Sequence, residues 1–178
     1  MSRNRTPHLS GAGFTLIEMI VVIAIIISLA GVIVPVISGE LEDAKQARAV
    51  ADVNRIATAI GQYIKDTGYL PTGNKGQDKY HWLYSYGDQP SSNDFASGPG
   101  THLRRFLEMN DFGGKDWKGP YAGDIGPDPW GRAYIVNVHG YGQDDENVLV
   151  LCAGPNGEVD THPSATQAGG DDIVILID

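Results

Sequence analysis

The sequence predicts an α+β protein in which one long N-terminal helix packs on a small, three-stranded antiparallel sheet. Two observations support this prediction. Residues 14–66 read as one long helical stretch, which is first almost entirely apolar and then apolar on one face. Toward the C-terminus, three short segments rich in β-branched residues are separated by turn-forming sequences. A helix followed by consecutive strands is typical of the α+β class.

Length and charge narrow the possible classes of function. The 178 residues make about one domain, and 13 basic against 22 acidic side chains give a net charge of −9. Because proteins that bind nucleic acid need a basic surface, we expect no nucleic acid partner. The single cysteine, Cys152, excludes an intramolecular disulfide, and its apolar surroundings in the sequence are typical of a core residue.

The N-terminal apolar run is long enough to cross a bilayer as a helix. Residues 14–38 contain one charged side chain, Glu18, and a membrane-spanning helix needs about 20 apolar residues. Arg3 and Arg5 precede this run and acidic residues follow it, which predicts a cytoplasmic N-terminus by the positive-inside rule. A carboxylate within the hydrocarbon costs about 2.5–3.5 kcal/mol on insertion scales, so Glu18 is a candidate functional residue.

Three interpretations of the run compete. A secretory signal peptide could be cut after Ala30, but the apolar run continues to Ile37 and contains Glu18, whereas such peptides have short, uncharged cores. A plain single-pass anchor explains the length of the run and leaves Glu18 without a role. The third interpretation depends on the residues that surround Glu18.

Residues 13–18, Gly-Phe-Thr-Leu-Ile-Glu, follow a short basic leader and open the apolar run. This motif resembles the class III signal of the type IV pilin superfamily, which includes type IV pilins and type II secretion pseudopilins, and Pro35 matches a proline common in that superfamily's helix. The resemblance implies that a prepilin peptidase cuts between Gly13 and Phe14 and methylates the new N-terminus. In a filament, the Glu18 carboxylate would then pair with the Phe14 amine of a neighbouring subunit at low dielectric.

Beyond the apolar run, the helix is expected to continue to Asp66 and to end at Thr67-Gly68. It carries one apolar stripe, which comprises Val50, Val53, Ala57, Ile60 and Ile64. This stripe favours a helix that packs on its own domain over a coiled coil. The predicted organisation is a leader (1–13), a transmembrane or filament-core helix (14–39), an amphipathic helix (40–66) and a periplasmic globular domain (67–178).

The globular domain is predicted to place its strands near its C-terminal end. The three predicted strands cover residues 133–139, 148–152 and 173–177, with a hairpin turn over 140–147. The middle of the chain, residues 67–132, is predicted to be irregular. It would contain a loop over 87–100, a short helix over 101–109 capped by Thr101, and aromatic side chains that pack the domain.

Motifs near the C-terminus extend the resemblance. They are WKGPY at 117–121, DPWGR at 128–132, GPNG at 154–157 and DDI at 171–173. Together they resemble the C-terminal domain of the major pseudopilins of type II secretion, which implies a pilin-like fold. Residues 72–114 have no clear counterpart in that family.

The segment 154–172 is rich in oxygen donors and contains no Lys or Arg. Calcium takes six to eight oxygen ligands in flexible geometry, yet composition alone favours a solvated acidic turn. The resemblance implies a structural calcium ion here, with Asn156, Asp160, Asp171 and Asp172 as candidate ligands. Asn156 replaces a frequent aspartate, and residues 161–168 look like an insertion.

No catalytic motif stands out in the sequence, so we expect no enzyme. The resemblance implies a structural subunit of a periplasmic pseudopilus that is first anchored in the inner membrane by one helix. Its partners would be copies of itself, other pseudopilins, the prepilin peptidase and an inner-membrane assembly platform with its ATPase. Two alternatives remain open, a subunit of a surface type IV pilus and a membrane-anchored periplasmic binding or enzymatic domain.

Overall fold

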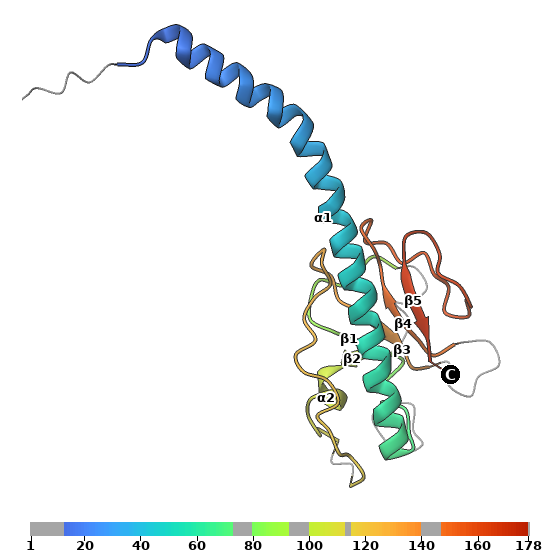
Figure 1. The fold of residues 1–178 in the computed structure, drawn as a ribbon. Helices are drawn as coiled ribbons and strands as arrows, with labels where there is room; N and C mark the ends of the chain where they lie inside the picture. The colour runs from blue at the N-terminus through green and yellow to red at the C-terminus, as the bar shows by residue number, and fades with distance from the viewer. Residues whose placement is uncertain (1–12, 73–79, 93–99, 113–114, 140–146, 178) are drawn as a thin grey trace, which may run out of the picture. The chain divides into compact units, whose positions relative to one another are not determined.

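The structure is a computed structural model that describes residues 13–72, 80–92, 100–112, 115–139 and 147–177. The chain divides into two compact units, Met1–Glu42 and Asp43–Asp178. One continuous helix, α1 (Leu16–Thr67), runs through both units and confirms the predicted long helix (Figure 1). The helix ends at Thr67, and the next residue, Gly68, has a φ of 74° and donates its N–H to the Ile64 carbonyl at 2.7 Å. This left-handed cap is the stop that the sequence predicts.

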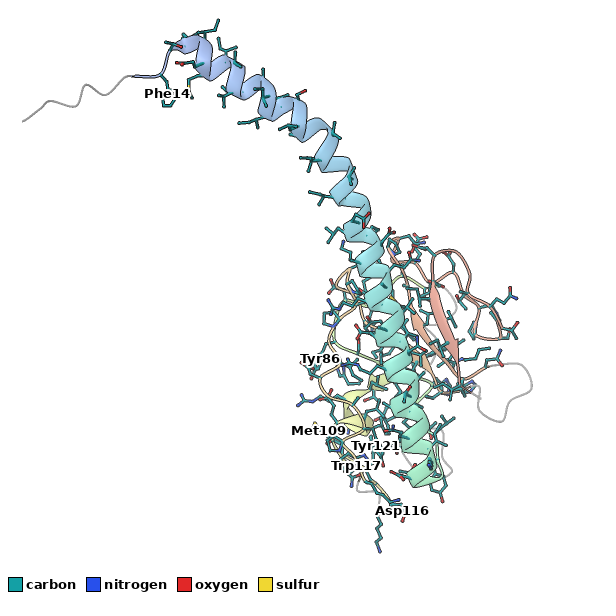
Figure 2. All side chains as sticks on the ribbon, in the orientation of Figure 1. Phe14, Tyr86, Met109, Asp116, Trp117 and Tyr121 are labelled. Carbon is teal, nitrogen blue, oxygen red and sulfur yellow. The ribbon has the colours of Figure 1, made fainter. Side chains whose placement is uncertain are left out.

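In the first unit, apolar side chains stand out from α1 on all sides (Figure 2). Ile17 is 69% exposed, Ile27 is 65% exposed and Val34 is 61% exposed. Among the described residues, α1 is the one helix long and apolar enough to cross a membrane. So much apolar surface is unfavourable in water, which means that this part of α1 needs lipid or other protein chains around it.

The second unit contains a mixed sheet of five strands in the order β2-β1-β3-β4-β5. The strands are β1 (Trp82–Tyr84), β2 (Gly100–His102), β3 (Ile135–Asn137), β4 (Leu149–Cys152) and β5 (Ile173–Leu176). Strands β1 and β2 pair in parallel, and the other neighbours pair antiparallel. The predicted strands are confirmed as β3, β4 and β5, although each is shorter than predicted.

The prediction of a three-stranded antiparallel sheet was therefore wrong in strand number: β3, β4 and β5 pair antiparallel as predicted, but the sheet has five strands and is mixed because β1 and β2 pair in parallel. The two additional strands, β1 and β2, lie in the middle of the chain that we expected to be irregular. Each has three residues, and β2 reads Gly-Thr-His, so neither carries a period-two apolar pattern. They form strands because β3 offers an open edge to β1, and β1 in turn offers one to β2.

The predicted helix over 101–109 is reduced to one turn, α2 (Arg104–Leu107). Thr101 does not cap it, because Thr101 lies in β2 opposite Leu83 and the N-cap residue is Leu103. Pairing with β1 therefore places Thr101 in a strand, although the local sequence predicts that it caps a helix. Of the predicted loop and hairpin turn, residues 93–99 and 140–146 lie outside the described residues.

The sheet buries apolar side chains on both faces. Along β3, Val136 belongs to the cluster that packs on α1, while Ile135 belongs to a second cluster on the other face. The second cluster comprises Trp82, Ile135, Leu149, Leu151 and Ala153. This alternation follows from the two-residue period of a strand. The first and larger cluster lies between α1 and the sheet (Figure 1).

The buried face of α1 differs slightly from the predicted stripe. Val53 and Ile60 are fully buried as predicted, but Val50 is 42% exposed. Ala49 and Ile56 are fully buried instead. Residues one apart on a helix lie about 100° from each other, so a small rotation of the stripe exchanges Val50 for Ala49.

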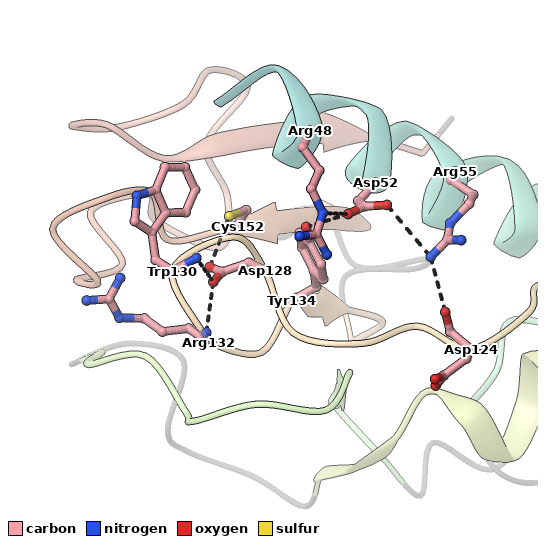
Figure 3. Close-up of polar contacts among 9 residues, drawn as sticks. All are labelled: Arg48, Asp52, Arg55, Asp124, Asp128, Trp130, Arg132, Tyr134 and Cys152. Atoms are coloured by element: carbon pink, nitrogen blue, oxygen red, sulfur yellow. Dashed lines mark hydrogen bonds and ion pairs between the residues drawn. The ribbon is translucent and has the colours of Figure 1, made fainter. Parts of the chain in front are cut away.

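A polar contact joins α1 to the residue that precedes β3 (Figure 3). The hydroxyl of Tyr134, a residue only 1% exposed, donates to Asp52 Oδ2 at 3.0 Å. Asp52 also forms ion pairs with Arg48 at 3.5 Å and with Arg55 at 3.7 Å. Burial, together with the Asp52 carboxylate, raises the pKa of Tyr134, so the phenol remains a hydrogen-bond donor.

Replacing Tyr134 with phenylalanine is expected to lower the free energy of unfolding by about 1.5 kcal/mol, because a hydrogen bond to a charged group is lost and the ring is kept. Urea unfolding of the full chain in detergent, followed by tryptophan fluorescence, measures this change. Tyr86→Phe is the matched control, because the Tyr86 hydroxyl bonds to the exposed Arg104. The control should change stability by less than about 0.5 kcal/mol, and equal effects of the two substitutions would contradict the prediction.

Candidate functional site: the helix start and the acidic loop

Thr15 and Glu18 close the start of α1 through reciprocal hydrogen bonds. Glu18 Oε2 accepts from the Thr15 backbone N–H and from the Thr15 hydroxyl, each at 2.7 Å. The Glu18 backbone N–H donates to Thr15 Oγ1 at 3.3 Å. This arrangement is a capping box, and it places the carboxylate at the positive end of the helix dipole. Glu18 therefore has hydrogen-bond donors within its own chain.

From the sequence we predicted a role for Glu18 between subunits and none for Thr15 as its capping partner. The signal was present, because Thr-x-x-Glu before an apolar run is a recognised start of a helix. The two predicted processing residues, Gly13 and Phe14, precede α1 without helix or strand structure. The Phe14 side chain is 83% exposed, and apart from the chain neighbours of Gly13, no atom of the described residues lies within 4 Å of the position of a Cβ on Gly13.

Asp172 is the buried carboxylate of the segment between β4 and β5, and it is only 7% exposed. Its Oδ2 accepts hydrogen bonds from the Thr161 hydroxyl at 2.6 Å, the Thr161 N–H at 2.7 Å and the Asp160 N–H at 2.9 Å. Burial raises the pKa of Asp172 despite these bonds, and its Oδ1 is buried with no hydrogen-bond partner. A buried, unpaired carboxylate oxygen is costly, which makes it a candidate for contact with a cation.

The other three predicted ligands lie in the same hydrogen-bond network. Asn156 donates its backbone N–H to Asp171 Oδ2 at 3.0 Å and its side-chain Nδ2 to Asp160 Oδ2 at 3.2 Å. Asp171 Oδ1, like Asp172 Oδ1, is buried without a partner. In the part of the chain that the structure describes, no three acidic, histidine or cysteine side chains converge in a preformed metal cluster. The donor set is nevertheless suited to calcium, since it offers oxygen atoms whose hydrogen bonds are incomplete.

Residues of the preceding DPWGR motif (128–132) also contact the segment 154–172, which we call the acidic loop. Arg132 Nη1 donates to the Gly154 carbonyl at 3.1 Å and to the Pro155 carbonyl at 3.4 Å. Asp128 Oδ1 accepts from the backbone N–H of Arg132 at 2.8 Å, and Asp128 Oδ2 accepts from the Cys152 thiol at 3.4 Å (Figure 3). From the sequence we used this motif only for the resemblance and did not predict that it holds the acidic loop in place.

Cys152 is fully buried, as the sequence predicts for a core residue. Burial raises the pKa of its thiol to about 12, so the thiolate is not formed near neutral pH. The thiol acts as a hydrogen-bond donor to Asp128 and contributes to the support of the loop.

A helix that begins with a Thr15–Glu18 capping box, is apolar and exposed in its first half and packs on a sheet in its second half is typical of the class of pilin-like subunits. The chain is 32% identical over 158 residues to type II secretion system core protein G of Escherichia coli K12, covering 88% of this chain and 90% of that protein. The proteins of the same name from Klebsiella pneumoniae and Pseudomonas aeruginosa are 30% identical over 146 residues and 29% identical over 124 residues. These alignments cover 82% and 69% of this chain, and 85% and 70% of those proteins.

The chain belongs to the family of type II secretion system core protein G, the major pseudopilins. No family model matches the sequence, and no solved structure is significantly similar to it. The relatives cover most of the chain, so the family applies to both the apolar helix and the globular domain.

Proposed function

We propose that the chain is the structural subunit that polymerises through its N-terminal helix into the periplasmic pseudopilus of a type II secretion system. The observation that carries this proposal is the similarity to core protein G over 88% of the chain. The exposed apolar half of α1 supports it, because such a surface needs a bilayer before assembly and neighbouring helices afterwards. The relatives carry the name of a secretion subunit, which favours the pseudopilus over a surface type IV pilus.

We place the unassembled subunit in the inner membrane, crossing it once, with the globular domain in the periplasm. Its partners in this proposal are further copies, other pseudopilins and an inner-membrane assembly platform. Prepilin peptidase acts between Gly13 and Phe14, where the chain is exposed and not yet helical. The new Phe14 amine of one subunit then attracts the Glu18 carboxylate of the next at low dielectric. In this proposal the protein works by assembly, and we assign it no reaction.

Mature protein from the native cell is expected to begin at Phe14, with a methyl group on the amine. Intact mass and N-terminal sequencing of the membrane fraction test this expectation. Gly13→Leu places a large side chain at the cleavage site and should leave the leader, with Arg3 and Arg5, attached. A native N-terminus at any other residue, such as one after Ala30, would contradict the proposal.

We also propose that the acidic loop holds a structural calcium ion through Asn156, Asp160, Asp171 and Asp172. Two buried oxygens without hydrogen-bond donors, Asp171 Oδ1 and Asp172 Oδ1, support this proposal. Bound calcium would supply positive charge to these carboxylates. The position of the carboxylates is set by the chain itself, because the Thr161 N–H donates to Asp172 and Arg132 donates to the Gly154 carbonyl.

A further inference from the structure

The acidic loop contains an unusual dipeptide, Asn156-Gly157. Every other asparagine in the chain is followed by a residue with a side chain. The backbone nitrogen that follows an asparagine can attack the side-chain amide carbon, and glycine hinders this attack least. Asn156 is exposed, so water reaches the amide. The dipeptide therefore has the chemical requirements for deamidation.

Hydrogen bonds hold the Asn156 side chain in an orientation that favours this attack. Its Oδ1 accepts from the Glu158 backbone N–H at 2.7 Å, which folds the side chain over the Gly157 peptide and polarises the amide carbonyl. Negative charge develops on Oδ1 when the amide carbon is attacked, and a fixed N–H donor stabilises that charge. The Nδ2 atom, which leaves as ammonia, donates to Asp160 Oδ2 at 3.2 Å.

The attacking group is also fixed in place. Gly157 has a φ of 75°, a backbone conformation that residues with a side chain rarely adopt, and a Cβ at this position would meet the Arg132 guanidinium, so the position favours glycine. The Gly157 N–H also donates to the Ala153 carbonyl at 3.3 Å, longer than the usual 2.9–3.0 Å for such bonds, so the attack has only a weak hydrogen bond to break.

We propose that Asn156-Gly157 is a self-modification site at which the folded loop converts Asn156 to an acidic residue. The Gly157 nitrogen forms a bond to Asn156 Cγ, and the bond between Cγ and Nδ2 breaks. Water carries the Gly157 amide proton to the departing nitrogen, which leaves as ammonia and leaves a cyclic succinimide. A second water opens the ring at either carbonyl and gives aspartate or isoaspartate. The overall change is amide plus water to carboxylate plus ammonium, because the departing ammonia takes up the proton that the new carboxyl group releases, and no oxidant or cofactor is needed.

The product adds one negative charge beside Asp160 and Asp171, the two carboxylates that contact Asn156. The aspartate product supplies an anionic oxygen donor where the amide supplied a neutral one, so the modified loop demands a cation more strongly. The modification itself requires no bound ion, and its test is independent of the pseudopilus and calcium proposals.

Incubation of the purified full chain in detergent and ¹⁸O-labelled water, at mildly alkaline pH, tests the proposal. Ring opening places ¹⁸O in the new carboxylate, and peptide mapping locates the label. We expect the label at Asn156 and none at Asn147, which precedes Val148 and serves as an internal control. No label at Asn156, or equal labelling of the two residues, would overturn the proposal.

A pair of variants separates the folded geometry from the dipeptide itself. Glu158→Pro removes the N–H donor that contacts Asn156 Oδ1, whereas Glu158→Ala keeps it. Labelling at Asn156 is expected to fall at least about tenfold in the proline variant and to remain unchanged in the alanine variant. Equal labelling in the two variants overturns the role of the loop geometry. If circular dichroism shows that the proline variant is unfolded, wild-type chain in urea replaces it, and equal or faster labelling there also counts against the proposal.

Discussion

Glu18→Ala is expected to abolish filament assembly and to leave membrane insertion intact. Insertion should be unimpaired, because the substitution removes a carboxylate that costs about 2.5–3.5 kcal/mol in the hydrocarbon. Assembly should fail because the carboxylate that attracts the Phe14 amine of a neighbouring subunit is absent. Its loss also removes the acceptor of two hydrogen bonds from Thr15. Sedimentation of sheared filaments and fractionation of membranes measure the two outcomes separately.

Two further variants separate the charge of Glu18 from its capping role. Glu18→Gln keeps an oxygen that can complete the capping box but removes the negative charge. Because the Phe14 amine of the neighbouring subunit then has no carboxylate to pair with, this variant should fail to assemble, as Glu18→Ala does. Normal filaments from the glutamine variant would show that the cap, and not the ion pair, is what assembly requires. Glu40→Ala is the matched control, since it removes an exposed carboxylate from the same helix outside the apolar run. It should assemble normally.

The parts of the fold that the sequence predicts are those whose local pattern is long or strong. The helix α1 has 52 residues, and both its apolar run and its glycine stop are visible in the sequence. Strands β3, β4 and β5 are buried or half-buried and rich in β-branched residues, so their composition identifies them. Their ends were predicted less well, because the ends of elements depend on neighbours more than on composition.

The parts that were not predicted form through contacts between distant residues. Thr101 pairs with Leu83 of β1 and so leaves the helix that local capping rules assign to it. In the candidate site, the four oxygen donors are recognisable from composition and resemblance. Thr161 is not recognisable in this way, because its role is to donate two hydrogen bonds to Asp172, which lies 11 residues further along the chain. Patterns in sequence identify ligand chemistry more readily than the residues that orient it.

Calcium is expected to raise the melting temperature of the full chain in detergent by about 5–10 °C over the same protein in EGTA. The physical reason lies in the buried carboxylates, since desolvation raises the pKa of Asp172 and therefore disfavours its charged form. A cation that binds only the folded state offsets this cost. At a concentration 100 times its dissociation constant it stabilises by about 2.7 kcal/mol, and each kcal/mol corresponds to a few degrees in a domain of this size. Differential scanning fluorimetry measures the shift.

Substitution within the loop tests whether the shift comes from the proposed carboxylates. Asp172→Asn should abolish the calcium shift, because a neutral amide replaces the carboxylate whose Oδ1 has no partner. Glu158→Gln is the matched control, since Glu158 is an exposed carboxylate of the same loop whose backbone N–H, not its side chain, joins the network. The control should keep the full shift. A wild-type melting temperature that is the same in calcium and EGTA, or an equal shift with magnesium, would contradict a calcium site, because magnesium requires a smaller and more regular octahedron of ligands.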